Sequence, residues 1–207
     1  METPTPWSTG DPTRSPFALP RGMAGRLAGR LMLRINRQHE LADLLDIQPG
    51  AEVLEIGYGP GGLIDLLQRS PARRIAGVDP SPQMLDMASR RHREGIAPDR
   101  IDLRLGSAAQ TGFGDGEFDR VVSVNNVAIW PDLEAGLREA HRVTRPGGRA
   151  VIAWHGGTRP SLIARRLALP QEKLARIEGS LSGLFHEVTR YELAAFTVFT
   201  AFRAADR

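Results

Sequence analysis

The sequence has no cysteine, and Lys173 is the only lysine among its 207 residues. The absence of cysteine excludes a disulfide framework, thiolate metal sites and a cysteine nucleophile. The scarcity of lysine excludes two further kinds of site. A P-loop requires Gly-Lys followed by Ser or Thr, and the Tyr-x-x-x-Lys pair of a short-chain dehydrogenase would require a tyrosine where Leu169 stands.

Long hydrophobic runs and a targeting segment are also lacking. The longest apolar runs, such as residues 150–154 and 196–199, are far shorter than the roughly 20 residues that span a bilayer. The amino terminus is rich in Pro, Thr and Ser and lacks the apolar core of a secretory signal. We therefore expect no membrane span and a cytoplasmic location.

Charge of one sign does not accumulate along most of the chain. The formal net charge is +3, and almost all basic residues are arginines that alternate with Asp and Glu. We expect no nucleic-acid binding, which requires a basic face. In one stretch arginines recur at about one helical turn, which predicts a solvated helix face or, alternatively, contact with an anionic substrate or a membrane surface. These residues are Arg21, Arg26, Arg30, Arg34 and Arg37.

Composition divides the chain into three parts. Residues 1–20 contain five prolines and are expected to form a disordered tail. Residues 21–48 place apolar side chains at helical spacing and end before Pro49 and Gly50, so they predict an N-terminal helical cap. In residues 49–207 short apolar runs alternate with helical stretches, which predicts one domain built on a parallel sheet.

The pattern of this domain changes towards its end. Strands are expected at 52–56, 74–78, 101–105, 120–124 and 149–154, and helices at 61–68, 81–92 and 133–143, two of them capped by Ser81 and Asp132. A helical stretch at 161–180 then precedes two strands at 184–190 and 196–203. The short link between those strands predicts an antiparallel hairpin. The expected class is a doubly wound, seven-stranded α/β fold, mostly parallel, with an antiparallel C-terminal hairpin.

A glycine-rich turn follows the first strand of the sheet. Residues 53–62 read Val-Leu-Glu-Ile-Gly-Tyr-Gly-Pro-Gly-Gly. Glycine lets the backbone turn sharply and lets a ligand approach it closely. Gly57, Gly59 and Gly62 satisfy G-x-G-x-x-G, and Asp79 ends the second strand where a ribose-binding carboxylate is expected. This pattern alone fits a nicotinamide-dependent enzyme or a methyltransferase, because both bind adenosine.

Three further features favour a methyltransferase. Glu55 completes Glu-x-Gly-x-Gly, which resembles motif I of the class I methyltransferases that use S-adenosylmethionine. Residues 118–123 and 137–148 are similar to that family's fourth-strand motif and to its next helix and turn. The family's Rossmann-like sheet also ends with an antiparallel seventh strand. From residue 43 onward the chain resembles this family, and most closely the small methyltransferases related to quinone-biosynthesis C-methyltransferases.

The resemblance implies S-adenosylmethionine as the cofactor and assigns residues to its pocket. Asp79 would bind both ribose hydroxyls, and Ser107 stands where the family often has an acidic residue near the adenine amine. Arg34 or Arg37 would reach the methionine carboxylate. The implied cofactor residues are Glu55, Gly57, Tyr58, Gly59, Gly61, Asp79, Pro80, Ser107, Ala108 and Asn125.

Methyl transfer requires alignment of the acceptor and exclusion of water more than acid–base chemistry. In open α/β sheets the site lies beyond the carboxyl ends of the strands, which selects Asn126, Trp130 and His155 as catalytic candidates. His155 is either a base or a hydrogen-bonded loop residue. Trp130 either stacks on a planar acceptor or packs in the core. No spacing suggests a metal site, and the histidines expected on the surface are His39, His92 and His141.

The sequence therefore predicts a methyltransferase that acts on a small-molecule acceptor by in-line displacement, with O-, N- and C-methylation left open. The stretch between the fifth strand and the hairpin is too short for a large recognition insertion. We expect an open pocket, or one completed by a partner such as a second copy in a homodimer. Two alternatives remain: a nicotinamide-dependent oxidoreductase, and a catalytically idle scaffold that binds the cofactor.

Overall fold

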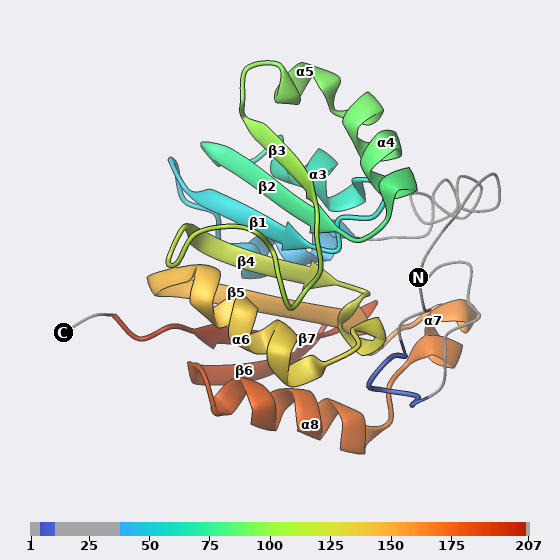
Figure 1. Cartoon of the computed structure of the whole chain (residues 1–207). Helices are drawn as coiled ribbons and strands as arrows, with labels where there is room; N and C mark the ends of the chain where they lie inside the picture. Colours follow the sequence, from blue (N-terminus) through green and yellow to red (C-terminus); the bar gives the residue numbers. More distant parts are fainter. Residues whose placement is uncertain (1–4, 11–37, 206–207) are drawn as a thin grey trace.

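A computed structural model describes residues 5–10 and 38–205 of the chain. Their strands form one seven-stranded sheet in the order β3-β2-β1-β4-β5-β7-β6 (Figure 1). Strands β1 to β5 are parallel, and β7 runs antiparallel to its neighbours β5 and β6. The predicted sheet and its terminal hairpin are confirmed. The strands are β1 (Glu52–Ile56), β2 (Arg74–Asp79), β3 (Ile101–Leu105), β4 (Phe118–Val124), β5 (Thr144–His155), β6 (His186–Glu192) and β7 (Phe196–Phe202).

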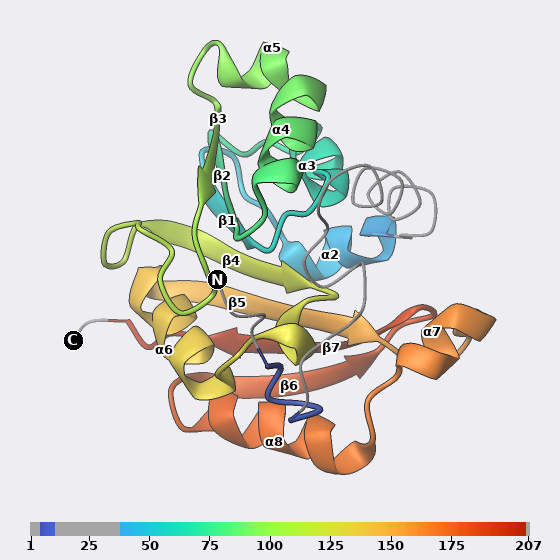
Figure 2. The same ribbon diagram turned by 45° about the vertical axis from the view of Figure 1, so that its right-hand side comes forward.

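Helices cover both faces of this sheet (Figures 1 and 2). One face packs against α2, α3 and α4, and the other against α6 and α8. None of the described helices is long and apolar enough to cross a membrane. The helices are η1 (Gln38–Leu41), α2 (Ala42–Leu45), α3 (Gly62–Leu67), α4 (Pro82–Arg91), α5 (Arg93–Ile96), η2 (Val127–Ile129), α6 (Leu133–Val143), α7 (Leu162–Leu167) and α8 (Gln171–Ser182).

Alternation along β1 explains how one short strand serves both layers. Val53 packs in the cluster that contains α3 and α4, whereas Leu54 and Ile56 pack in the cluster that contains α6 and α8. Successive side chains of a strand point to opposite faces, so a strand buried on both sides is apolar almost throughout. Glu55 interrupts this apolar pattern and is itself buried. Apolar packing does not explain a buried carboxylate, so Glu55 is a candidate functional residue.

Most predicted boundaries agree with the structure to within two residues. The Ser81 hydroxyl accepts a hydrogen bond from the Met84 N–H, and the Asp132 carboxylate accepts one from the Ala135 N–H, which confirms both caps. The helix predicted over 161–180 is wrong as a single element, because it is divided into α7 and α8. Pro170 separates the two helices, since proline lacks an N–H and disfavours the helical conformation of the residue before it.

Residues 5–10 form a clip over η2. The Trp7 N–H donates to the Trp130 carbonyl (2.9 Å) and the Trp7 indole to the Val127 carbonyl (2.7 Å). The Ser8 hydroxyl donates to the Ala128 carbonyl at 2.6 Å. Part of the segment predicted as a tail is therefore attached to the turn after β4.

The predicted helical cap is described only from residue 38 onward, as η1 and α2. Glu40 in η1 accepts a hydrogen bond from the Ala195 N–H at 3.0 Å, which ties η1 to the start of β7. The arginine stretch of residues 21–37, including Arg34 and Arg37, lies outside the described residues.

Candidate active site

The glycine-rich turn between β1 and α3 is a sharp bend with three left-handed residues. Gly57, Gly59 and Gly61 have φ angles of +79°, +53° and +84°. Glycine adopts such angles without the clash that a Cβ causes. The Gly57 N–H donates to the Val78 carbonyl of β2 at 2.7 Å, so the bend is held against the end of the neighbouring strand.

Each glycine of the bend leaves room for a different neighbour. A Cβ on Gly57 would overlap the Asn126 amide, and one on Gly61 would overlap the His92 ring. A Cβ on Gly59 would meet no atom of the described residues within 4 Å. The protein itself therefore fills the space beside Gly57 and Gly61, and leaves the space beside Gly59 open to a ligand.

Two buried carboxylates flank the bend. Glu55 is 2% exposed, and its Oε2 atom has no hydrogen-bond partner among the described residues. Burial, with a smaller contribution from the charge of Asp79, raises the pKa of Glu55 well above its usual value. Burying a carboxylate without a partner is costly, so a donor supplied from outside the protein would be bound favourably here.

Asp79 links the glycine bend to the turn after β2. Its Oδ2 accepts from the Gly59 N–H and its Oδ1 from the Ser81 N–H, both at 2.9 Å. Burial raises the pKa of Asp79 to about 6, against the lowering effect of these two hydrogen bonds. A carboxylate oxygen has about two acceptor sites, so each oxygen keeps one for a ligand hydroxyl.

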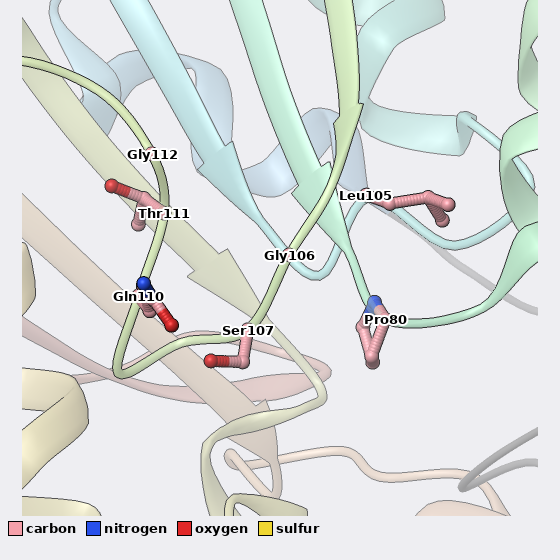
Figure 3. A pocket seen from close by; sticks show the side chains of 7 residues that line it. All are labelled: Pro80, Leu105, Gly106, Ser107, Gln110, Thr111 and Gly112. Atoms are coloured by element: carbon pink, nitrogen blue, oxygen red, sulfur yellow. The ribbon is translucent and has the colours of Figure 1, made fainter.

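A hollow of about 440 Å³ opens beside Asp79 at the carboxyl ends of β2 and β3 (Figure 3). Of the residues that the resemblance assigns to the cofactor, Pro80 and Ser107 line this hollow, and Ala108 is not among the lining residues. The Ser107 N–H donates to the Gln110 carbonyl at 3.1 Å. The remaining lining residues are Leu105, Gly106, Gln110, Thr111 and Gly112.

The sequence interpretation missed Leu105 as a lining residue. Its side chain is 51% exposed although it ends a strand. Exposure of a large apolar side chain beside a hollow favours contact with a flat apolar ligand surface. The only available signal was its position, directly before the Gly106-Ser107 turn.

The Tyr58 side chain leaves the bend and enters the core. Its ring lies where a Cβ of Gly77 would be, and its hydroxyl donates to the Arg104 carbonyl at 3.3 Å. Burial is the largest of the effects that raise its pKa. Tyr58 is thus placed to offer a ligand its backbone rather than its phenol.

Asn126 fastens the end of β4 to the end of β1. Its Nδ2 donates to the Ile56 carbonyl at 2.7 Å, and its Oδ1 accepts from the Ser123 hydroxyl and the Trp130 indole, each at 2.7 Å. The Trp130 ring is 5% exposed and packs against Gly136. Of the two readings of Trp130, the structure places it in the core.

The carboxyl ends of β4 and β5 carry the other two polar candidates. Asn125 has a φ angle of +56°, and its N–H donates to the Ala153 carbonyl at 2.9 Å. His155 ends β5, and its ring centroid is 5.4 Å from that of Trp154. Burial lowers the pKa of His155 to about 4, so its imidazole is neutral at pH 7.

The expectation that His92 lies on the surface is wrong. His92 is 2% exposed, with Nε2 at 3.0 Å from the Gly61 carbonyl and Nδ1 at 2.8 Å from Gln68 Oε1. Burial lowers its pKa. The signal was its spacing: Met84, Ala88 and His92 recur every four residues and share one helix face.

The other histidines are less informative. His141 is partly buried, with its ring centroid 5.0 Å from that of Phe185. His39 is exposed, as expected. Within residues 5–10 and 38–205, no group of three or more His, Cys, Asp or Glu side chains could hold a metal ion.

The fold and this site define a class, and comparison with known families agrees. Residues 53–148 match the family model described as Methyltransferase domain. Residues 53–148 therefore form a domain of the class I S-adenosylmethionine-dependent methyltransferases, and S-adenosylmethionine is the cofactor of that family.

Relatives extend this assignment. Over 109 residues the chain is 36% identical to the uncharacterized methyltransferase YdaC of Bacillus subtilis, covering 52% of this chain and 58% of YdaC. Over 109 residues it is 37% identical to demethylmenaquinone methyltransferase of Symbiobacterium thermophilum, covering 50% and 42%. Over 116 residues it is 36% identical to erythromycin 3''-O-methyltransferase of Saccharopolyspora erythraea, covering 55% and 38%. The chain thus spans less than two thirds of the length of these relatives.

Solved structures share the fold at low sequence identity. A Methanococcus maripaludis protein assigned to the S-adenosylmethionine-dependent methyltransferases has a TM-score of 0.70 at 19% identity, covering 88% of this chain and 94% of that chain. Haemonchus contortus phosphoethanolamine N-methyltransferase 2 has a TM-score of 0.69 at 17% identity, covering 94% and 61%. The [4+2]-cyclase SpnF has a TM-score of 0.64 at 15% identity, covering 90% and 85%.

Proposed function

We propose that this protein transfers a methyl group from S-adenosylmethionine to a small organic acceptor by in-line displacement. One observation carries the proposal: the backbone at Gly59 is open, its N–H donates to the buried carboxylate of Asp79, and the bend follows directly on the strand that holds the buried Glu55. These groups fit the polar parts of the cofactor, because carboxylates accept hydrogen bonds from hydroxyl and ammonium groups.

We assign the cofactor contacts as follows. Asp79 accepts hydrogen bonds from the two ribose hydroxyls, and Glu55 together with the bend of residues 57–61 surrounds the methionine part. Adenine occupies the hollow lined by Pro80 and Ser107, with Ala108 beside it. Asn125 borders the cofactor at the end of β4. The hollow next to Asp79 supports this order, since adenine is joined directly to the ribose.

The reaction requires little acid–base chemistry from the protein. When bound, S-adenosylmethionine would supply a methyl group activated by its sulfonium, ready for displacement by a nucleophilic O, N or C atom of the acceptor. Asn126 holds the ends of β1 and β4 together and acts as a positioning residue, with Trp130 fixing its amide. His155 is neutral and accepts the proton of an acceptor that must lose one.

The acceptor is left as a class. Two relatives of similar identity are named erythromycin 3''-O-methyltransferase and demethylmenaquinone methyltransferase, so the acceptor differs among proteins that resemble this chain equally. Fold alone does not decide the reaction either, because SpnF is a cyclase on the same fold. The domain division, a cytoplasmic location and homodimer formation also remain proposals.

Calorimetry with S-adenosylhomocysteine tests the cofactor assignment. We expect binding by the wild type and by Asp115→Asn, a control at an exposed carboxylate paired with Arg142, and none by Asp79→Ala. Absence of heat at millimolar S-adenosylhomocysteine would contradict the proposal. Enhanced fluorescence of NADH on mixing would instead favour an oxidoreductase.

An activity assay tests methyl transfer itself. The protein is mixed with S-adenosylmethionine and each of a panel of phenols, amines and quinols, and the formation of S-adenosylhomocysteine is measured. Asp79→Ala should abolish turnover, and Asp115→Asn should retain it. An idle scaffold would bind the cofactor without turning over any acceptor, and Asp79→Ala would then leave its biological function unchanged.

A further inference from the structure

Helix α7 carries an unusual share of exposed apolar surface. Among the described residues, five large hydrophobic side chains are exposed, and three of them belong to this helix of six residues. Leu162, Ile163 and Leu167 are 78%, 53% and 45% exposed. Scattered exposed hydrophobic residues are ordinary, whereas a contiguous group marks a contact surface.

The fold holds these side chains outward. Ala164 is buried, and its N–H donates to the Ser161 hydroxyl at 3.2 Å. The Trp154 indole donates to the Leu167 carbonyl at 2.7 Å. Helix α7 is therefore anchored to the end of β5 by its backbone and its one small residue.

The same helix is basic. Arg165 and Arg166 are exposed and make no ion pair with any described residue, and Arg159 precedes the helix and is also exposed. No acidic residue occurs from 156 to 171. Apolar and basic side chains on one exposed helix are typical of a segment that lies on an anionic lipid surface.

The position of α7 adds a second argument. It lies beyond the tip of β5 in both views (Figures 1 and 2), at the carboxyl edge where His155 stands. Residues 5–10 lie at this edge on η2, and η1 is tied here to Ala195.

We propose that α7 docks on the surface of an anionic lipid bilayer. Leu162, Ile163 and Leu167 enter the interfacial region, and Arg165 and Arg166 pair with lipid phosphates. Docking sets the open end of the site against the bilayer, where a membrane-dissolved acceptor is within reach. The docking step is independent of methyl transfer and is tested without it.

Co-sedimentation with vesicles tests the proposal. The probe is phosphatidylcholine vesicles containing about one third phosphatidylglycerol, compared with phosphatidylcholine alone, at low and high salt. We expect binding to the anionic vesicles that falls with salt. The double variants Leu162→Gln/Ile163→Gln and Arg165→Gln/Arg166→Gln should each weaken it by about tenfold or more.

A matched control separates position from charge. Arg93→Gln/Arg138→Gln removes two exposed arginines elsewhere and should change vesicle binding by less than about twofold. Circular dichroism of every variant should match the wild type, which shows that the fold is retained.

Two outcomes would overturn the inference. One is equal sedimentation of the wild type with anionic and neutral vesicles. The other is a dimer in sedimentation velocity that Leu162→Gln/Ile163→Gln converts to a monomer, with no vesicle binding by either form. In that case α7 is an interface between copies of the chain.

Discussion

On the β1–β2 side of the sheet, backbone N–H groups hold the buried carboxylate of Asp79, whereas on the β4–β5 side, the Asn126 and Trp154 side chains bond to backbone carbonyls. Asp79 accepts from two N–H groups, and Glu55 Oε2 has no described partner. Asn126 and Trp154 donate to the Ile56 and Leu167 carbonyls. Asp79 and Glu55 keep hydrogen-bonding capacity that a ligand can use, whereas the side-chain N–H groups of Asn126 and Trp154 are used within the fold.

This difference teaches where specificity resides. A pocket with unused acceptors selects a polar ligand by hydrogen bonds, and a wall whose polar groups are paired selects by shape. We therefore expect tight requirements for the cofactor and looser ones for the acceptor. The following variants test whether the two sides differ in this way.

Gly57→Ala should have the largest effect. The new Cβ meets the Asn126 amide at a φ of +79°, so the substitution damages both sides of the sheet at once. We expect the free energy of unfolding to fall by about 3 kcal/mol and S-adenosylhomocysteine binding to be lost. Gly50→Ala is the control, since Gly50 has φ of +84° and open space. It should cost about 1 kcal/mol. If urea unfolding gave the same loss of stability for Gly57→Ala and Gly50→Ala, the predicted clash of the new Cβ with Asn126 would be wrong.

Gly59→Ala should separate binding from stability. A Cβ there meets no atom of residues 5–10 or 38–205 within 4 Å, so the strain comes from the φ angle of +53°, and we expect a loss of about 1 kcal/mol. Affinity for S-adenosylhomocysteine should fall by about a hundredfold or more, because the methyl group occupies ligand space. Calorimetry and urea unfolding measure the two effects, and retained affinity would show that no ligand approaches this residue.

The Asp79 carboxyl should make stability and binding respond oppositely to pH. Its folded pKa of about 6 lies above the reference value of 3.8. Between these values the folded protein alone keeps the proton, so stability relative to Asp79→Asn falls as pH rises from about 4 to about 6. The fall should reach up to about 3 kcal/mol. Cofactor affinity should rise over the same interval, because the ionised form accepts both hydroxyls.

Urea unfolding and calorimetry across this interval check both slopes. Asp79→Asn should bind S-adenosylhomocysteine about a hundredfold more weakly. Its affinity should not rise with pH over this interval. If stability relative to Asp79→Asn rose with pH instead, the carboxyl would not be buried as described.

Trp130→Phe probes the paired side alone. Phenylalanine keeps one aromatic ring but is smaller than the indole, and it lacks the N–H that donates to Asn126 Oδ1, while Ser123 still donates to that oxygen. We expect a loss of about 2 kcal/mol in stability, from the hydrogen bond and the small cavity together, and less than about threefold in cofactor affinity. Thermal unfolding and calorimetry measure them. If Trp130→Phe abolished cofactor binding, the β4–β5 side would contribute to cofactor affinity as much as the β1–β2 side, and the comparison would be wrong.

His155→Gln should have the smallest effect on the cofactor, with a change in affinity below about twofold. If His155 accepts the acceptor's proton, kcat falls while the KM for S-adenosylmethionine is unchanged. Its pKa of about 4 keeps the imidazole neutral down to about pH 5. The wild-type rate should therefore show no acid limb at pH 6 to 7 from this group. An unchanged kcat would make His155 a structural loop residue.

The sequence predicted much of the first side and little of the second. Residues 53–62 specify the bend because only glycine tolerates its φ angles, and Asp79 follows from strand spacing. Asn126 and Trp130 were selected for the right region, but their mutual hydrogen bond depends on packing that brings β4 beside β1. Nothing local distinguishes a tryptophan that packs in the core from one that meets a ligand.

His92 and the break at Pro170 were predictable in part. The four-residue spacing of Met84, Ala88 and His92 indicates a buried helix face, and a proline within a helical stretch indicates its end. The exposure of Leu162 and Leu167 was not predictable, because apolar spacing predicts burial when no tertiary contact is known.

The clip of residues 5–10 has a practical consequence for anyone handling this protein. Three hydrogen bonds tie Trp7 and Ser8 to the turn after β4. Residues 5–10 are therefore attached to the carboxyl edge of the sheet, where the candidate active site lies. An affinity tag at that end would load this turn, whereas one after residue 205 would follow the end of β7 that pairs with Arg149, away from His155 at the other end of β5.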